Sequence, residues 1–279
     1  MIRKIGIIGC GTIGSELALA IDSGKVENAS LVALFDILNI NAIQLKSKLQ
    51  NSNPSVFSDF LEFVSSTSFL QADIIVEAAS QEAVRNFSRK LLECGKNLMI
   101  MSVGALSDYE FLSELIRSAS KNFGYIYLPT GAIAGIDAIR SVKDLLESVT
   151  LTTTKTPKAL ADAPFFKVNN INPSEISKKT IIYDGDAANA VNNFPANINV
   201  AAILSLAGLG IKKTSVKIIA DPEIEVNQHE ILAKGIFGEI MIKVRNVPST
   251  RNPKTSFLAV LSAVECLRSA CNNQLRIGT

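Results

Sequence analysis

A glycine-rich turn near the start of the chain constrains its fold more than any other feature. The apolar run Ile5–Ile8 leads directly into Gly9-x-Gly11-x-x-Gly14, and a helical pattern follows. In such a turn the first glycine permits the sharp bend, the second leaves room for a pyrophosphate, and the third lets helix and strand pack closely. The pattern predicts a strand, turn and helix that hold a dinucleotide at the helix N-terminus.

The next apolar run indicates which dinucleotide this is. Asp36 follows residues 30–35 and lies 22 residues beyond Gly14, the position at which a carboxylate accepts hydrogen bonds from the adenosine ribose. A Gly-rich turn followed by an ordinary surface aspartate is the alternative. Asp36 would repel a 2′-phosphate and so favours NAD, but Lys46 and Lys48 could offset that repulsion, which leaves NADP possible. The cofactor contacts expected here are Gly9, Gly11, Thr12, Ile13, Gly14 and Asp36.

Composition limits the class of protein. Hydrophobic residues make up 47% of the 279 and charged residues 19%, which is typical of a globular chain. A net charge of +2 argues against a nucleic-acid or membrane-surface partner. Four cysteines without CxxC spacing and a single histidine predict no metal site and no disulfide framework. Glycines and Glu16 interrupt the N-terminal apolar stretch, so we expect no signal peptide and a cytoplasmic protein.

The first half of the chain alternates strands and helices. Apolar strands separated by helices predict a doubly wound parallel sheet of the Rossmann type, covered on both faces. The strands are expected at 5–8, 30–35, 72–77, 97–104 and 124–129, and the helices at 41–50, 81–94 and 107–120. Ala78, Ala79 and Ser80 follow one strand, so we expect them at the cofactor edge, with Glu77 as part of that edge rather than a base.

The second half has a different pattern, which predicts an α+β substrate domain with an open sheet. A helix is expected at 136–147, strands at 148–154, 216–220 and 238–247, and a long excursion at 155–180. The apolar helix 255–272 is expected to pack back onto the nucleotide domain. The predicted domains are therefore 1–130 plus 255–279, which bind the dinucleotide, and 131–254, for substrate and dimerisation.

His229 is the only histidine, so any imidazole proton transfer uses it. It lies in the polar stretch 226–230 between two expected strands, and a solvated loop histidine is the equal alternative. Asn197 and Asn199 stand at the start of an apolar helix. One of them suits a helix cap, and the other could contact a nicotinamide carboxamide or a substrate carboxylate.

A third cluster precedes the last helix. Thr255 or Ser256 can cap that helix and leave Lys254 outward, which would make an anion site, and a plain helix start is the alternative. Lys254, the helix N-terminus and Arg245 are the candidate donors to substrate carboxylates, although Arg245 could equally be a solvated strand residue. Asp184 and Asp186 are expected to be surface acids rather than a metal pair.

Several motifs together resemble the L-aspartate dehydrogenase family over essentially the whole chain. They are the glycine turn, Thr130-Gly-Ala132-Ile-Ala-Gly135, Phe194-Pro-Ala-Asn197-Ile-Asn199-Val-Ala, His229 and Asn252-Pro-Lys-Thr-Ser256. The resemblance implies NAD(P)-dependent oxidation of L-aspartate to iminoaspartate, which feeds NAD biosynthesis or hydrolyses to oxaloacetate and ammonia. It also implies a homodimer, His229 at the active site, and cofactor contacts from Ala132 and one of the two asparagines.

Two other functions fit the same residues. One is a related two-domain reductase acting on an amino-acid semialdehyde or a cyclic imine, and the other is an NAD-binding regulator without chemistry. For aspartate oxidation, His229 would accept the proton that the substrate amine must lose. Asn199, Lys254, Thr255 and Ser256 are the residues expected to bind the substrate.

Overall fold

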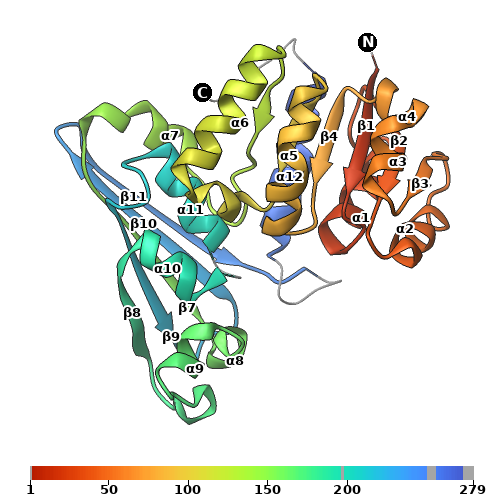
Figure 1. The fold of residues 1–279 in the computed structure, drawn as a ribbon. Coiled ribbons are helices and arrows are strands. Elements are labelled where there is room, and N and C mark those ends of the chain that lie inside the picture. Colours follow the sequence, from red (N-terminus) through yellow and green to blue (C-terminus); the bar gives the residue numbers. More distant parts are fainter. Residues whose placement is uncertain (1, 196–197, 250–255, 273–279) are drawn as a thin grey trace. The chain divides into compact units, whose positions relative to one another are not determined.

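The computed structural model describes residues 2–195, 198–249 and 256–272 (Figure 1). The chain forms two compact units. One contains the residues up to Pro129 together with the segment that begins at Val260, and the other is Thr130–Ala259.

The first unit is built on a six-stranded sheet in the order β3-β2-β1-β4-β5-β6. All its neighbouring strands are parallel. The strands are β1 (Arg3–Ile8), β2 (Ala29–Phe35), β3 (Ser55–Phe57), β4 (Ile74–Glu77), β5 (Asn97–Ile100) and β6 (Ile126–Tyr127). This strand order is that of a doubly wound sheet, so the predicted Rossmann architecture is confirmed.

The helices of this unit follow local signals in the sequence. They are α1 (Thr12–Asp22), α2 (Asn39–Lys46), α3 (Phe60–Ser65), α4 (Thr67–Gln71), α5 (Gln81–Glu93) and α6 (Tyr109–Lys121). Ser80 caps α5 by accepting a hydrogen bond from the Ala83 N–H. Gly95 ends α5 with a φ of 71°, a left-handed conformation that favours glycine. Asp108, rather than Ser107, caps α6.

The last helix, α12 (Phe257–Cys271), supplies part of the core of the first unit. Its Ala263 and Leu267 are fully buried and belong to the same hydrophobic cluster as Ile5 and Ile7 of β1 and Leu17 of α1. The expectation that this helix packs back onto the N-terminal part of the chain is therefore confirmed.

Three strands of the first unit are shorter than predicted, and the one expected at 72–77 begins at Ile74. The strand expected at 97–104 ends at Ile100, and the 3₁₀ turn Val103–Ser107 follows it. The backbone leaves the sheet here because the Ser102 N–H donates to the buried Glu77 carboxylate instead of continuing a ladder. The strand expected at 124–129 pairs with β5 only over Ile126–Tyr127.

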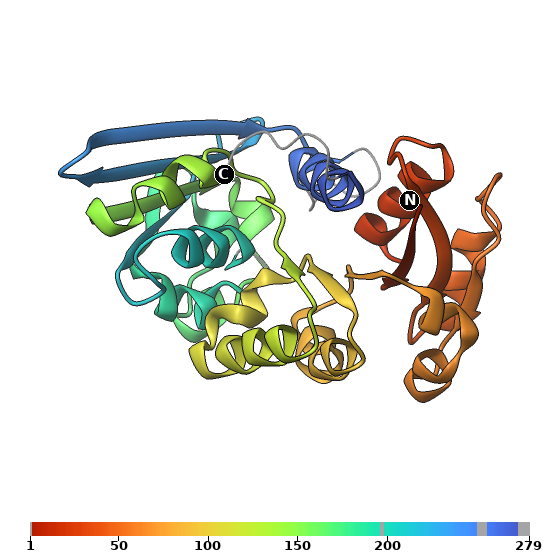
Figure 2. The same ribbon diagram turned by 90° about the horizontal axis from the view of Figure 1, so that it is seen from above.

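The second unit has a five-stranded mixed sheet in the order β11-β10-β7-β9-β8. Only the β7 and β9 pair is parallel. The strands are β7 (Leu146–Lys155), β8 (Thr180–Asp186), β9 (Thr214–Ala220), β10 (Asn227–Gly235) and β11 (Gly238–Asn246). Three helices cover one face of this sheet (Figures 1 and 2). They are α7 (Ile136–Ser141), α10 (Ala187–Asn193) and α11 (Ile198–Ala207).

The predicted elements of this unit need three corrections. The helix expected at 136–147 ends at Ser141, and after the 3₁₀ turn Lys143–Leu145 the strand β7 begins at Leu146. The excursion at 155–180 contains the short helices α8 (Pro157–Leu160) and α9 (Pro164–Val168) and the 3₁₀ turn Pro173–Glu175. Two strands, β8 and β10, were not expected, and β10 carries His229.

Within the described ranges, no helix has both the length and the apolar character needed to cross a membrane. The same residues contain no group of three or more histidine, cysteine, aspartate or glutamate side chains placed to hold a metal ion.

Candidate functional site

The glycine turn has the shape that a diphosphate requires. Gly9 has a φ of 93°, and a Cβ there would lie 2.7 Å from the carbonyl carbon of Ala78. At Gly14 a Cβ would collide with the carbonyl oxygen of Gly9. A Cβ at Gly11 would instead meet nothing within 4 Å. The space beside Gly11 is therefore open, at the N-terminus of the eleven-residue helix α1, where Thr12 and Ile13 begin the first turn.

Asp36 lies at the carboxyl end of β2 and is 8% exposed. Its carboxylate accepts hydrogen bonds from the Cys10 N–H at 2.8 Å and the Leu38 N–H at 2.9 Å. These two bonds and a third from the Asn41 side-chain amide at 3.3 Å hold the carboxylate in place, and its remaining lone pairs can accept hydrogen bonds from a diol.

A pocket of about 150 Å³ opens beside this carboxylate. The loop after β4 contributes Ala79 and Ser80, and apolar surface comes from Ile37 and Phe87. Its charged lining residues, among those described, are the acids Asp36 and Glu82, and neither Lys46 nor Lys48 reaches it. The pocket therefore suits a ribose diol and disfavours a 2′-phosphate.

Glu77 ties together two loops at this sheet edge. Its buried carboxylate accepts hydrogen bonds from the Ala79 N–H at 2.8 Å, the Ser102 N–H at 3.0 Å and the Ser102 hydroxyl at 2.9 Å. Burial raises the pKa of Glu77, and these hydrogen bonds oppose that rise. Ala78 is fixed in turn by its N–H bond to the Ile8 carbonyl. Glu77 thus holds the Ala78–Ser80 loop in position through its carboxylate.

His229 lies in the second unit, on the helix-covered face of β10. It is 5% exposed, so it is not a solvated loop residue. Thr153 of β7 is its direct cross-strand partner, and the Thr153 hydroxyl lies 3.0 Å from Nδ1 of the imidazole. Because Nδ1 is engaged with Thr153, Nε2 is the nitrogen left to exchange a proton with a ligand.

Electrostatics keep this imidazole neutral. Burial, and then the nearby charge of Lys155, lower the pKa of His229 to about 3. Burial also lowers the pKa of Lys155 to about 8. At neutral pH the site therefore presents an unprotonated histidine beside a lysine that is still largely charged.

The loop that contains Ala132 is anchored at the same end of this sheet. Asn246, at the end of β11, donates from Nδ2 to the Ala132 carbonyl at 2.9 Å, and both residues are buried. In the strand register Asn246 pairs with Asn227, two positions from His229 on the same face. The second unit therefore gathers Ala132 and His229 at one end of one face.

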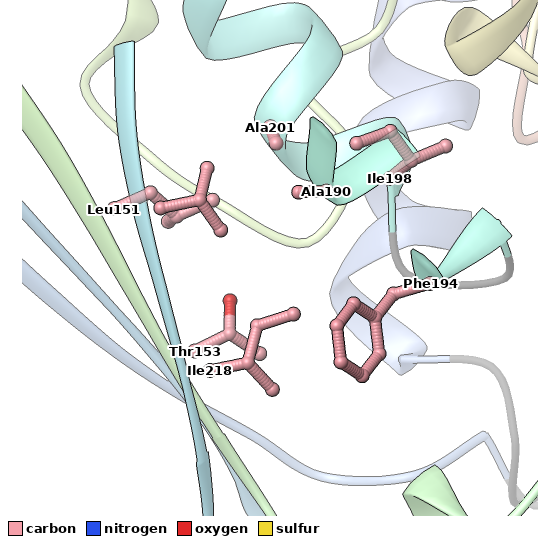
Figure 3. Close-up of a pocket in the computed structure, with 8 residues that line it drawn as sticks. Leu151, Thr153, Ala190, Phe194, Ile198, Ala201 and Ile218 are labelled. Carbon is pink, nitrogen blue, oxygen red and sulfur yellow. The ribbon is translucent and has the colours of Figure 1, made fainter. Parts of the chain in front are cut away.

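A very small cavity of about 10 Å³ lies on this face next to Thr153. Figure 3 shows Thr153 and Ile218 of the sheet on one side and Phe194, Ile198 and Ala201 on the other. The volume is that of about one water molecule and the remaining lining side chains are apolar, so this cavity is packing space rather than a substrate site.

The other predicted site residues are placed as follows. Asn199 is exposed, in the first turn of α11, and Ser256 immediately precedes α12. Asn197, Lys254 and Thr255 lie outside the described residues. Arg245 pairs with Gln228, so it occupies the opposite face of the sheet from His229.

Thr153 and Lys155 are neighbours of His229 that the sequence analysis did not single out. The signal was the alternation along 149–155, which sets Val149, Leu151, Thr153 and Lys155 on one face. A threonine and a lysine that continue a buried stripe are polar residues on an inner face, and such residues call for a functional explanation.

Comparisons with known proteins cover both units. The family model "Aspartate dehydrogenase, C-terminal" matches residues 137–270, and "Homoserine dehydrogenase, NAD binding domain" matches residues 9–129. An L-aspartate dehydrogenase of Nitrosopumilus maritimus is 46% identical over 99% of this chain and 100% of its own length. One from Methanosarcina barkeri is 44% identical over 99% of each chain.

A solved structure supports the same relationship. The crystal structure of aspartate dehydrogenase from Thermotoga maritima matches with a TM-score of 0.75 and 26% identity, over 100% of both chains. With two relatives above 40% identity over nearly its full length, this chain belongs to the L-aspartate dehydrogenase family.

Proposed function

We propose that this chain oxidises L-aspartate with NAD(P)⁺ to iminoaspartate, releasing NAD(P)H and a proton. Iminoaspartate then hydrolyses to oxaloacetate and ammonia or is used in NAD biosynthesis. The observation that carries the proposal is the buried, neutral His229 in a chain whose full length matches L-aspartate dehydrogenases. The same full-length match favours neither a semialdehyde or imine reductase nor a regulator without chemistry.

The residues of the first unit fit a dinucleotide. The open space at Gly11 would take the diphosphate, with Gly9, Thr12, Ile13 and Gly14 shaping the turn. Asp36 would accept hydrogen bonds from the ribose hydroxyls. Ala78, Ala79 and Ser80 would line the neighbouring edge of the parallel sheet. When bound, the nicotinamide supplies the hydride acceptor. We propose further cofactor contacts from Ala132 and from one of Asn197 and Asn199.

The two carboxylates beside the ribose pocket make NAD the preferred form. Asp36 and Glu82 would both repel a 2′-phosphate, and no lysine or arginine is among the described residues of that pocket. We therefore expect NADP to be used less well than NAD.

His229 supplies the proton acceptor. The substrate ammonium must lose a proton before its Cα can give up a hydride, and a neutral imidazole whose Nε2 is not engaged by Thr153 can take that proton. Thr153 holds the ring through Nδ1. For substrate binding, the proposal keeps Asn199, Lys254, Thr255 and Ser256.

The proposal extends to the domains, the oligomeric state and the location of the protein. We propose that 1–130 with 255–279 bind the dinucleotide and that 131–254 bind substrate and form a homodimer. The face of the five-stranded sheet opposite its helices, which carries the exposed Met241, would be the surface buried between two copies. All four cysteines are free, which supports a cytoplasmic location.

The test is an assay of NAD(P)H formation at about 340 nm with L-aspartate and each cofactor. We expect turnover with aspartate, faster with NAD, and a loss of about 10²- to 10⁴-fold in kcat for His229→Asn. NADH binding, followed by fluorescence, should change little in that variant. Absence of aspartate turnover in the wild-type protein would overturn the function, and undiminished turnover in the variant would overturn the role of His229.

A further inference from the structure

We propose that Lys155 binds a carboxylate of the substrate beside His229, and that this bound carboxylate makes His229 a stronger base. The inference deepens the proposed function and rests on it, because aspartate and its analogues are the dicarboxylates concerned.

The strand register places Lys155 next to the histidine. Thr153 pairs directly with His229, and Lys155 is two residues further along β7. Side chains two apart on a strand share a face, so Lys155 follows Thr153 on the helix-covered side. On β9 its partner is the small residue Ala220. Lys155 is half-buried, as expected for an amine that faces a ligand site rather than bulk solvent.

Lys155 is also the only lysine or arginine on this face among the described strands of the sheet. The register sets the other strand cations on the opposite, uncovered face, and they are Lys217, Lys234, Lys243 and Arg245. A dicarboxylate at His229 would therefore find its sheet-borne cation in Lys155.

The other described groups that face His229 carry no charge. β7 contributes Thr153 besides Lys155, and β11 contributes Val244 directly opposite and then Asn246. On its own strand the flanking positions of the same face are Asn227 and Ile231. Above the sheet, the helix residues beside Thr153 are the apolar Ala190, Ile198 and Ala201. The one acid on this face of β7, Glu147, stands near the far end of the strand.

This arrangement couples substrate binding to proton acceptance. In the free protein the lysine charge and burial both lower the pKa of His229, so the imidazole is a poor base. A carboxylate bound at Lys155 offsets that charge and favours the protonated imidazole, which raises the pKa of His229 by about 1 to 3. The histidine thus becomes a better acceptor when the ammonium that must lose its proton is present.

The single histidine makes the coupling measurable without turnover. Tag-free protein saturated with NAD and carrying ¹⁵N-labelled histidine gives one imidazole to follow by NMR. Succinate serves as the probe because it has both carboxylates of aspartate but no amine to oxidise. Titrations between about pH 7 and about pH 4, with and without succinate, report the protonation of His229.

Two variants complete the experiment. Lys155→Met removes the charge and keeps the length of the side chain. Lys217→Met removes a lysine on the opposite face of the neighbouring strand and is the matched control. We expect Lys155→Met to weaken succinate binding, measured by calorimetry, about 10- to 100-fold, the usual loss for a hydrogen bond to a charged group. Lys217→Met should bind like the wild type.

The outcomes separate this inference from the function. The inference is supported if bound succinate raises the pH at which His229 becomes protonated in the wild type but not in Lys155→Met. An unchanged His229 titration in the succinate-bound wild type overturns it, whether or not any variant folds. Equal succinate affinity in Lys155→Met and the wild type overturns it as well. If succinate behaves as expected but aspartate is not oxidised, the carboxylate site stands and the proposed reaction falls.

Discussion

Replacing Thr153 with valine removes the hydroxyl that lies 3.0 Å from Nδ1 of His229 and keeps the shape of the side chain. Both residues are buried, Thr153 at 3% and His229 at 5% exposure, so water cannot readily replace the lost partner. A buried polar atom left without its partner costs about 1–3 kcal/mol. We expect Thr153→Val to lower the free energy of unfolding by an amount in that range.

The catalytic effect follows from the same number. If the hydrogen bond holds the imidazole for proton transfer, its loss raises the barrier by up to the same 1–3 kcal/mol, which lowers kcat about 5- to 150-fold. Initial rates at about 340 nm with saturating aspartate and NAD measure this, and urea unfolding measures stability. The pH profile of kcat should change with Thr153→Val, because the valine leaves Nδ1 free to exchange protons.

Two further variants separate positioning from packing. Thr153→Ser keeps the hydroxyl and should restore most of kcat, although it removes a methyl group. Thr152→Val changes the neighbouring threonine on the opposite face of β7 and should leave kcat and its pH profile unchanged. Wild-type kcat and pH profile in Thr153→Val would refute the positioning role of the hydroxyl.

Other substitutions test the nucleotide turn and an anchoring carboxylate. Gly11→Ala fills open space at an ordinary φ of −72°, so NADH binding measured by fluorescence should weaken about tenfold while the melting temperature is kept. Gly14→Ala places a methyl group against the Gly9 carbonyl and should lower both the NADH affinity and the melting temperature. Burial would raise the pKa of Asp22, but backbone N–H donors of residues 50–52 lower it overall. Stability from Asp22 is therefore present above about pH 4 and lost as pH falls through the lowered pKa, and Asp22→Asn should flatten that acid loss in urea unfolding.

The nucleotide half was predictable because its signals are local. Gly9, Gly11 and Gly14 follow an apolar strand, Ser80 and Asp108 stand at helix starts, and Gly95 stands at a helix end. Strand lengths were less predictable. Where β5 ends depends on Glu77, a residue distant in sequence whose carboxylate captures the Ser102 N–H.

The strand β10 was missed for a reason connected with function. Its inward positions are Asn227, His229, Ile231 and Ala233, and two of these four are polar. Polar residues on an inner face erase the alternation that marks a strand, so the segment resembles a loop in sequence. The same residues belong to the face that gathers Thr153 and Lys155, so the local rule fails where the site is built.

The contribution of α12 to the first hydrophobic core has a consequence for synthesis of the chain. Ala263 and Leu267 are buried with Ile5 and Leu17, residues made more than two hundred positions earlier. While the ribosome is still translating the second unit, the nascent part of the first unit has an apolar surface that nothing yet covers. That surface is a natural target for chaperones, and folding of the first half to be made is completed only when the last long helix emerges.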